Sequence, residues 1–466
     1  MRWDLTLNKK WIVAERAHAL GDSFTIVNQC VLVAKRSGVL VEGFSVFDPK
    51  DITAAFMKRV QERGQSAELK GSTFELIGPQ YLAPHVDKLV KDCKVSNITY
   101  VTSPFVHVSQ TNGKFALRTK LRVLNVDDSP VLLKLLNHVF SSQGWVENVG
   151  QITNPMDAVE KILALNPDVV TLDIQMPGKN GLQVLKELLA VRYFPVLMIS
   201  SLSMEDGSLV FNALNAGAFD YIQKPTAEER ASFTDDILSK SLSAVEAGVA
   251  PVALPKESSR PALRSLSLIT SYPPNLVWAI GSSTGGTQAI TRAFSMLPRM
   301  IPPTLIVQHI PPIFSRAFAE SLAAVCPFKV KEAAHGDALE ANCVYIAPGG
   351  KQMTLERAAS GRYAIAINDD EPVNRFKPSV DYLFNRLATK TDLQFVAGVL
   401  TGMGRDGSAG LLALRNAGAR TFAQDESSSV VYGMPKAAFE NGGAEQVCHI
   451  DDVAQQLLKF SANSKA

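Results

Sequence analysis

Between residues 121 and 246, short apolar runs alternate with longer segments whose apolar residues recur at helical spacing. The apolar runs predict buried strands at Arg122–Val126, Val146–Val149, Asp168–Leu172, Val196–Ile199 and Phe219–Ile222. Amphipathic helices are expected between these strands, with a last helix after Thr226. Five strand–helix units in succession predict a doubly wound parallel sheet, which binds ligands at the carboxyl ends of its strands.

The same alternation returns near the C-terminal end of the chain. Val277–Gly281 predicts a buried strand, the small residues that follow predict a turn, and a helix is expected from about Thr287. Further strands are predicted at Thr304–Gln308 and Phe395–Leu400. We therefore expect a second doubly wound α/β domain.

The remaining segments have different patterns. Residues 1–118 mix β-rich runs with helical spacing and predict a small α/β domain of unknown role. Its expected elements are β-rich runs at Thr25–Ala34 and Ser72–Ile77 and helices at Ile52–Arg63 and Val86–Asp92. Residues 247–274, with five prolines among serines and alanines, predict a linker. The expected domains are thus 1–118, 119–246, the linker 247–274, and 275–460.

Composition narrows the class of protein. The chain has 466 residues, of which 46% are hydrophobic and 20% charged, and this balance is typical of soluble globular proteins. A net charge of only +2 gives no general basic field for nucleic acid. The five cysteines lack paired spacing, which favours free thiols in a reducing compartment. Neither a signal peptide nor an apolar run of membrane-spanning length is found, so we expect a cytoplasmic protein without membrane insertion.

Polar side chains stand at the carboxyl ends of the strands in the region from 121 to 246. Asp127 and Asp128 follow the first strand, Asp173 the third, Ser200 the fourth and Lys224 the fifth. Three carboxylates brought together by the fold suit Mg²⁺, which would neutralise phosphoryl oxygens while one aspartate attacks phosphorus. The alternative is that the first two aspartates cap the following helix.

This region resembles the receiver domains of two-component response regulators, whose fold is flavodoxin-like. The resemblance rests on Asn125–Ser129, Asp173–Pro177, Ser200 and Lys224–Pro225. It implies that Asp173 is the phosphoacceptor, that a sensor histidine kinase is the phosphodonor, and that Mg²⁺ is needed for phosphorylation. The implied site also contains the acidic pair Asp127 and Asp128, the switch residues Ser200, Tyr221 and Lys224, and as metal ligands Asp128, Asp173 and the backbone of Gln175.

Ser283 lies in a turn between the first strand and helix of the C-terminal region. Gly281, Ser283 and Gly285 match G-x-S-x-G, in which flanking glycines let the backbone expose a nucleophilic serine near unpaired helix N–H groups. A phosphate-binding loop would need a lysine where Thr287 stands. An ordinary glycine–serine turn remains an alternative reading of this segment.

A histidine and an aspartate follow two other strands of the C-terminal region. His309 comes before two prolines, and Asp406 lies in a glycine-rich turn before a helix. A parallel sheet would bring Ser283, His309 and Asp406 to one edge, as a serine hydrolase requires. Asp406 could instead cap its helix and His309 could bond to a loop, and His335 and His449 are lower-ranked candidates for the histidine.

Several motifs of the C-terminal region resemble the CheB family of chemotaxis methylesterases, in which a receiver is joined to a protein-glutamate methylesterase. They are Ile280–Thr287, Gln308–Pro312, Tyr345–Gly349, Pro372–Arg375, Leu400–Gly407 and Tyr432–Pro435. One departure is Ser282, where alanine is common. The resemblance covers roughly three quarters of the chain and leaves residues 1–118 unexplained.

The resemblance implies the hydrolysis of glutamyl methyl esters on the cytoplasmic domains of methylated chemoreceptors, and often glutamine deamidation. It implies Ser283, His309 and Asp406 as the catalytic triad and no cofactor for the esterase step. Thr284, Gly285, Met403 and Arg375 are candidates for oxyanion or substrate contacts. In the family, the unphosphorylated receiver covers the esterase cleft, and phosphorylation lifts this block.

Two other classes of function remain open from the sequence. One is a non-enzymatic signalling protein with a decayed esterase, which an intact triad argues against. The other is a DNA-binding response regulator, which is disfavoured because no basic helix-turn-helix pattern is found in the C-terminal region.

Overall fold

The computed structural model describes most of the chain from residue 114 onward and shorter stretches before it. The described residues are 23–27, 30–36, 39–47, 57, 60, 73–79, 82–93, 98–111, 114–201, 204–226, 229–247 and 272–462. The chain divides into two compact units, residues 1–171 with 238–248 and residues 172–237 with 249–466. The boundary falls within strand β10, so the five-stranded sheet described below belongs to both. Among the described residues, none of the helices combines the length and apolar character needed to cross a membrane.

The N-terminal region contains two small sheets and the helix α3 (Ala83–Asp92). The first sheet has the order β1 (Ser23–Val27), β6 (Phe105–Thr111), β7 (Lys114–Arg118), and the second β3 (Val39–Phe47), β2 (Cys30–Arg36), β4 (Thr73–Gly78), β5 (Ile98–Thr102). The expected α/β character is thus confirmed. The helix expected at Ile52–Arg63 lies outside the described residues except for Met57 and Val60, which are helical, and nearly all of the expected linker lies outside them.

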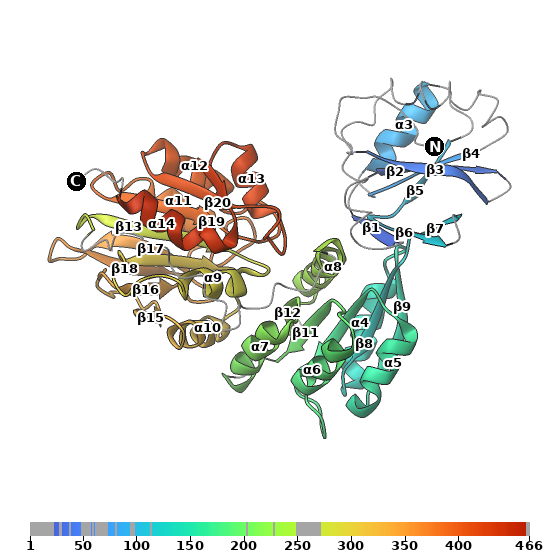
Figure 1. Cartoon of the computed structure of the whole chain (residues 1–466), viewed down its shortest axis with the longest axis horizontal. Helices are drawn as coiled ribbons and strands as arrows, with labels where there is room; N and C mark the ends of the chain where they lie inside the picture. Colours follow the sequence, from blue (N-terminus) through green and yellow to red (C-terminus); the bar gives the residue numbers. More distant parts are fainter. Residues whose placement is uncertain are drawn as a thin grey trace. The chain divides into compact units, whose positions relative to one another are not determined.

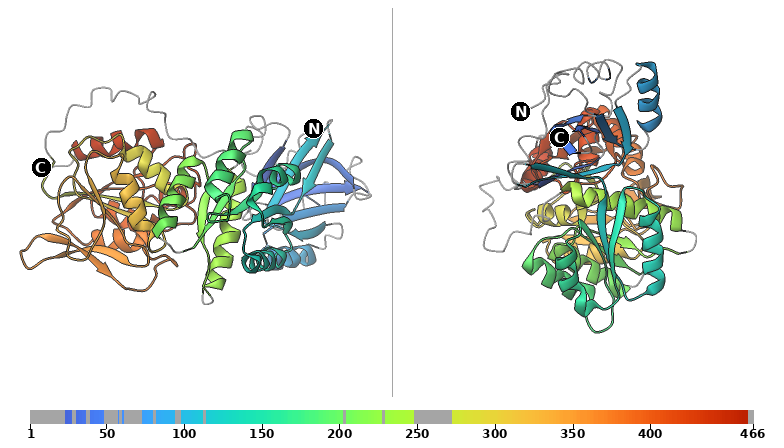
Figure 2. Two further views of the ribbon diagram at one scale, coloured as in Figure 1. Left: turned by 90° about the horizontal axis from the view of Figure 1, so that it is seen from below. Right: turned by 90° about the vertical axis from the view of Figure 1, so that its right-hand side faces the viewer.

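All five strands expected between residues 121 and 246 are present in one sheet. Its strands are β8 (Leu121–Val126), β9 (Val146–Ile152), β10 (Val169–Asp173), β11 (Val196–Ser200) and β12 (Asp220–Gln223), in the order β12-β11-β10-β8-β9. The helices are α4 (Pro130–Ser141), α5 (Ala158–Leu165), α6 (Gly181–Val191), α7 (Met204–Ala216) and α8 (Arg230–Ala247). Helices cover both faces of this sheet, so β10 and β11 are buried along their whole length (Figures 1 and 2).

The C-terminal region is built on a seven-stranded sheet whose paired neighbours are all parallel. In sheet order the strands are β15 (Lys329–Glu332), β16 (Cys343–Ile346), β14 (Thr304–Gln308), β13 (Leu276–Ser282), β19 (Gln394–Val399), β20 (Arg420–Gln424) and β21 (Gln446–Cys448). The helices are α9 (Gly286–Phe294), α10 (Phe314–Ala323), α11 (Val380–Leu387), α12 (Ser408–Asn416), α13 (Met434–Glu440) and α14 (Val453–Ala462). An antiparallel hairpin of β17 (Gln352–Arg357) and β18 (Tyr363–Asn368) forms a separate layer.

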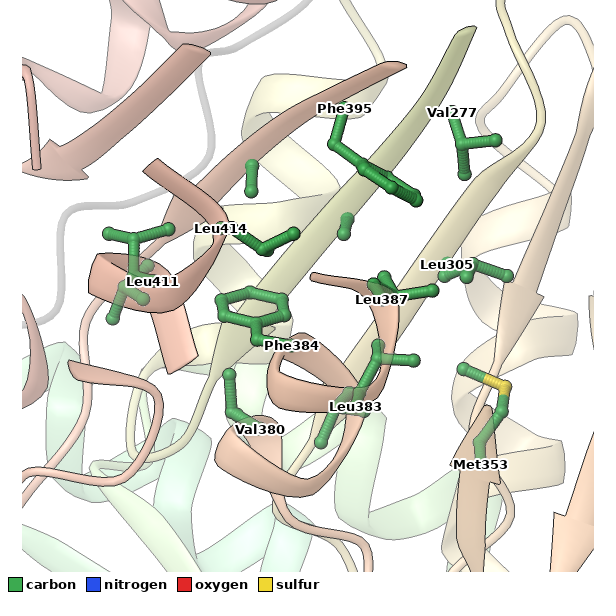
Figure 3. Packing of buried hydrophobic residues seen from close by; sticks show 14 of the residues in the cluster. Val277, Leu305, Met353, Val380, Leu383, Phe384, Leu387, Phe395, Leu411 and Leu414 are labelled. Atoms are coloured by element: carbon green, nitrogen blue, oxygen red, sulfur yellow. The ribbon is translucent and has the colours of Figure 1, made fainter. Parts of the chain in front are cut away.

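The central strand β13 is buried on both faces, as a doubly wound sheet requires. Val277 and Ala279 belong to a large apolar cluster with residues of α11 and α12 (Figure 3). Trp278 points to the opposite face, where its Nε1 donates a hydrogen bond of 2.8 Å to Ser461 of α14. Successive side chains of a strand point to opposite faces. Because both faces of β13 are buried, the strand forms a continuous apolar run in the sequence.

The strand order creates a switch point beside β13. The chain leaves β13 for β14 on one side of the sheet, and the later strand β19 pairs with β13 on the other side. The loops after these three strands therefore lie together at their carboxyl ends. Ser283, His309 and Asp406 all belong to these loops.

Candidate functional site

The position of Ser283 is fixed by the two strands that flank β13. Ser282 pairs with Gln308 in the parallel register, so Ser283 and His309 are the next residues on adjacent strands. The His309 N–H donates to the Ser282 carbonyl at 3.0 Å, and the Ser283 N–H donates to the Thr401 carbonyl at 3.0 Å. The backbone then turns through Gly285, whose φ of +74° favours glycine. The sheet ladder itself thus places the serine beside the histidine.

His309 and Asp406 form a buried pair. Nε2 of the imidazole lies 2.8 Å from Oδ2 of the carboxylate, and the two side chains are 7% and 0% exposed. A carboxylate only accepts, so the neutral imidazole carries its hydrogen on Nε2 and a lone pair on Nδ1. Nδ1 is buried and has no hydrogen-bond partner among the described residues. Ser283 and His309 are therefore neighbours, but His309 Nδ1 and Ser283 Oγ form no hydrogen bond. In active sites without substrate, catalytic hydrogen bonds are often long or poorly aligned.

The carboxylate of Asp406 accepts hydrogen bonds from five donors. They are His309 Nε2, Asn374 Nδ2, Ser379 Oγ, and the N–H groups of Val380 and Asp381. Burial alone would raise the pKa of Asp406, but the hydrogen bonds and the charge of His309 outweigh it and hold the pKa below its ordinary value. The side chain does not cap α12, because Gly407 occupies the N-cap position. These contacts favour the ionised carboxylate beside the imidazole.

A close approach of α11 to β13 makes this arrangement possible. A Cβ on Gly281 would lie 2.2 Å from Cγ1 of Val380, the first residue of α11. Without that Cβ, the start of the helix lies close enough for its N–H groups to reach Asp406. Gly402 has a similar role beneath the serine, since a Cβ there would lie 2.8 Å from Cβ of Ser283.

The expected oxyanion and substrate residues surround this pair. Thr284 and Gly285 form the turn that leads into α9, and Met403 lies in the loop after β19, next to Gly402. Arg375 is exposed in a loop before α11, and its guanidinium lies 3.5 Å from Asp235. The structure brings the first three around Ser283 and leaves the Arg375 side chain 88% exposed.

The two lower-ranked histidines lie in other settings. His335 is exposed, and its ring pairs at 3.7 Å with Glu356 of the β17–β18 hairpin. His449 accepts a hydrogen bond from the Asp451 N–H at the start of a short helix. Neither histidine belongs to a loop after β13, β14 or β19.

A second group of polar residues lies at the carboxyl ends of the five-stranded sheet. Asp127, Asp128 and Asp173 each offer an oxygen, and these oxygens lie within 4.8 Å of one another. Lys224 forms an ion pair of 2.9 Å with Asp173. The N-cap of α4 is Ser129 rather than either neighbouring aspartate. A set of clustered carboxylate oxygens with one exposed member fits the ligand preference and partial hydration of Mg²⁺.

Ser200 and Tyr221 lie on β11 and β12, the two strands next to β10 in the sheet. Ser200 ends β11, is buried, and donates to the Ser201 carbonyl at 3.0 Å. Tyr221 is buried in β12, and burial together with the charges of Asp220 and Asp236 raises the pKa of its phenol. Its ring lies 5.0 Å from that of Phe314 at the start of α10. Gln175 follows β10 and is exposed.

Within the second compact unit, β12 contacts the Ser283 turn and α7 contacts the helix α9 that follows it. The hydroxyl of Thr284 donates a hydrogen bond of 2.8 Å to Asp220, and this contact is buried. Gln288 of α9 donates to the Leu214 carbonyl at 2.7 Å. The residue after the candidate nucleophile is thus bonded to the residue before Tyr221.

Comparisons with known proteins agree in both regions. Residues 278–457 match the CheB methylesterase family, and residues 123–232 match the response regulator receiver domain. A protein-glutamate methylesterase/protein-glutamine glutaminase of Salmonella typhimurium is 41% identical over 352 residues, covering 74% of this chain and 98% of that protein. The protein of the same name from Agrobacterium fabrum is 40% identical over 344 residues, covering 74% and 97%. The CheB methylesterase catalytic domain of Thermotoga maritima is 33% identical with a TM-score of 0.38, covering 40% of this chain and 97% of that structure.

Proposed function

The chain belongs to the family of protein-glutamate methylesterases/protein-glutamine glutaminases that carry a receiver domain, and from this premise we propose that Ser283, His309 and Asp406 are its catalytic triad. The chain is a phosphorylation-regulated serine hydrolase of chemotaxis adaptation, which converts glutamyl methyl esters to glutamate and methanol. The buried His309–Asp406 pair beside Ser283 carries the proposal.

The proposed reaction runs through an acyl-enzyme. Ser283 Oγ attacks the ester carbonyl, and its proton moves to Nδ1 of His309, the nitrogen that faces away from Asp406. Asp406 stabilises the imidazolium through Nε2. The proton then passes to the departing methoxy oxygen and methanol leaves. Water, deprotonated by the same nitrogen, then attacks the acyl carbon. The bond to Ser283 Oγ breaks, His309 returns the proton to that oxygen, and the glutamate is released. With a glutamine side chain the leaving group is ammonia.

The developing oxyanion needs donors on the side of the carbonyl opposite the histidine. We assign this role to backbone N–H groups of the Thr284–Gly285 turn together with that of Met403, because both loops lie beside Ser283. Arg375 is exposed next to this region and is suited to contact acidic side chains around the methylated glutamate.

We further propose that Asp173 accepts a phosphoryl group from a sensor histidine kinase. Asp128, Asp173 and the backbone carbonyl of Gln175 would hold Mg²⁺, with Asp127 completing the acidic pair. The ion supplies neutralisation of the phosphoryl oxygens during transfer. Lys224 already pairs with Asp173 and would pair with the phosphoryl group after transfer. Ser200 would hydrogen-bond the phosphoryl group and Tyr221 would report its presence.

The contact between Thr284 and Asp220 supports an inhibited state without phosphate. A buried hydrogen bond holds the turn that carries Ser283, and Tyr221, the residue after Asp220, packs against Phe314 of α10. Phosphorylation that moves Ser200 and Tyr221 would weaken this contact and free the turn for substrate. This is a two-state interface biased by a local change of charge.

The proposed substrates are methylated glutamates on the cytoplasmic domains of chemoreceptors. The enzyme would therefore act in the cytoplasm without inserting into the membrane. Neither nucleic acid nor a cofactor for the esterase step enters the proposal.

The proposal is tested by methanol release from methylated receptor membranes, with and without a small phosphodonor. We expect Ser283→Ala to reduce the rate by at least about 10⁴-fold, because the nucleophile is removed. The matched control is Ser282→Ala, which removes the neighbouring hydroxyl bonded to Gln308 and should retain activity within a few fold. Wild-type rates in the Ser283→Ala variant would exclude the proposed nucleophile.

A further inference from the structure

Phe376 lies against the face of the catalytic histidine. The centroids of the Phe376 and His309 rings are 3.6 Å apart, and their planes differ by 9°. The His309 side chain is otherwise enclosed, with 7% of its surface exposed. We propose that Phe376 is a positioning residue for the reaction, which holds the imidazole plane between Ser283 and Asp406. This inference rests on the proposed role of His309.

A tight turn brings Phe376 into this place. Val373 and Phe376 exchange two backbone hydrogen bonds of 3.1 and 2.9 Å around Asn374 and Arg375. These two central residues have φ of +53° and +71°, a conformation that few residues other than glycine adopt. Asn374 is among the side chains that tolerate it. The turn reverses the chain and directs Phe376 back over the sheet edge.

The turn is also anchored from beneath. Gln352 of β17 is fully buried, and its amide donates to the Phe376 carbonyl at 3.2 Å and accepts from the Ser379 N–H at 2.9 Å. Ser379 and Asn374 in turn donate to Asp406. The segment 374–379 therefore fixes both Asp406 and His309. It holds the carboxylate by hydrogen bonds and the imidazole by stacking.

The stack has two consequences for the reaction. It restrains rotation of the ring, so that Nε2 stays directed at Asp406 and Nδ1 stays on the opposite side of the ring, available to accept the proton of Ser283. It also places an aromatic face beside the imidazolium that forms when Ser283 attacks, and such a face attracts a cation. A misplaced general base lowers the rate of the chemical step more than it lowers substrate binding.

The test compares full-length variants in the methanol-release assay. Phe376→Leu keeps an apolar side chain but removes the aromatic face, and we expect kcat to fall roughly tenfold with KM within about twofold of wild type. Phe376→Tyr retains the face and should restore kcat. Phe439→Leu, which removes a half-exposed phenylalanine from α13, is the control for the loss of an aromatic ring elsewhere.

A second measurement reports the imidazole directly. In wild-type protein labelled with ¹⁵N-histidine, with the signal assigned by its loss in His309→Gln, we expect the neutral ring to be protonated on Nε2 alone. Phe376→Leu should show a mixture of tautomers or a broadened signal, while Phe376→Tyr should match wild type. Unchanged kcat and an unchanged His309 signal in Phe376→Leu would overturn the inference. If Ser283→Ala remained active, the proposed function would fail instead, so the two failures are distinguishable.

Discussion

The acidic cluster of the five-stranded sheet and the Asp406 site of the seven-stranded sheet occupy equivalent places in their folds. Both lie at the carboxyl ends of parallel strands near the centre of the sheet. In the first, three carboxylates crowd together and one of them is exposed. In the second, one buried carboxylate accepts from five donors of the chain itself. The number and sign of the neighbouring groups, rather than the position in the fold, decide what each aspartate can do.

The difference between the two sites is clearest at Asp381, a second carboxylate beside Asp406. Asp381 lies near Asp406, and Asn374 donates to both through its amide nitrogen at 2.8 Å. The chain thus separates these two charges with its own polar group. Among the three aspartates of the other site, a cation is the expected bridge. In the proposed functions, the Asp406 site holds a fixed internal charge, whereas the acidic cluster receives a metal ion and a phosphoryl group from outside.

The largest expected effect comes from removing the fixed charge. Asp406→Asn retains the size of the side chain but presents an amide where His309 Nε2 now donates, which disfavours the productive tautomer. We expect methanol release to fall by about 10³- to 10⁴-fold. Phosphorylation of the variant should be normal, which can be measured with a small phosphodonor. Loss of both activities would mean that the two sites do not fail independently, and the comparison would break.

The reciprocal change is Asp173→Asn in the acidic cluster. Basal methanol release should remain, because the esterase groups are untouched, but stimulation by a phosphodonor should disappear. Asp157→Asn is the matched control, since this half-exposed aspartate of the same region bonds to the surface residues Lys161 and Asn154. Equal stimulation of wild type and Asp173→Asn would contradict the assignment of the phosphoacceptor.

The smallest expected effect concerns Asp381, which shares the amide of Asn374 with Asp406. Burial and the neighbouring charge of Asp406 raise the pKa of Asp381 above its ordinary value. The folded state therefore favours the protonated carboxyl. The contribution of this group to stability is present at pH below the unfolded value of about 3.9 and is lost as pH rises through the folded pKa. Asp381→Asn removes this dependence.

Urea unfolding of wild type and Asp381→Asn from pH 3.5 upward measures the difference in unfolding free energy. We expect wild type to lose stability relative to the variant as pH rises, whatever the constant offset between the two proteins. A difference that stays level with pH would show that the Asn374 bridge fully compensates the second charge.

The sequence predicted the elements that carry strong local patterns. The strands β8, β10, β11 and β12 and the central strands β13, β14 and β19 are largely buried, and their apolar runs identified them. The edge strand β9 was predicted as well, although it is partly exposed. The edge strand β15, with the sequence KVKE, and the three-residue β21 were missed, because short edge strands remain partly exposed and lack such runs. The strands β16 and β20 were missed although they are mostly buried, because apolar runs of three or four residues do not distinguish a strand from other buried segments. The β17–β18 hairpin was missed as well, since it lies outside the main sheet.

The same limit applies to the candidate site. Ser283, His309 and Asp406 each follow a predictable strand, so the expectation of a parallel sheet was enough to predict that they lie together. Phe376 does not follow a strand, and its place depends on a turn with two residues of positive φ and on a buried glutamine in a distant hairpin. A contact of this kind arises from tertiary structure, and the only local sign was the motif Pro372–Arg375 beside it.

The backbone pairing of Ser282 with Gln308 has a consequence for how this domain can change. Because the ladder between two adjacent strands sets the spacing of Ser283 and His309, a change in the length of the loop between α9 and β14 leaves that spacing unaltered. The tip of the β17–β18 hairpin can also change, because a Cβ on Gly361 would meet no other atom within 4 Å. The base of the hairpin cannot, because Gln352 there bonds to Ser379. These connections can therefore vary in length and sequence while Ser283 and His309 keep their positions.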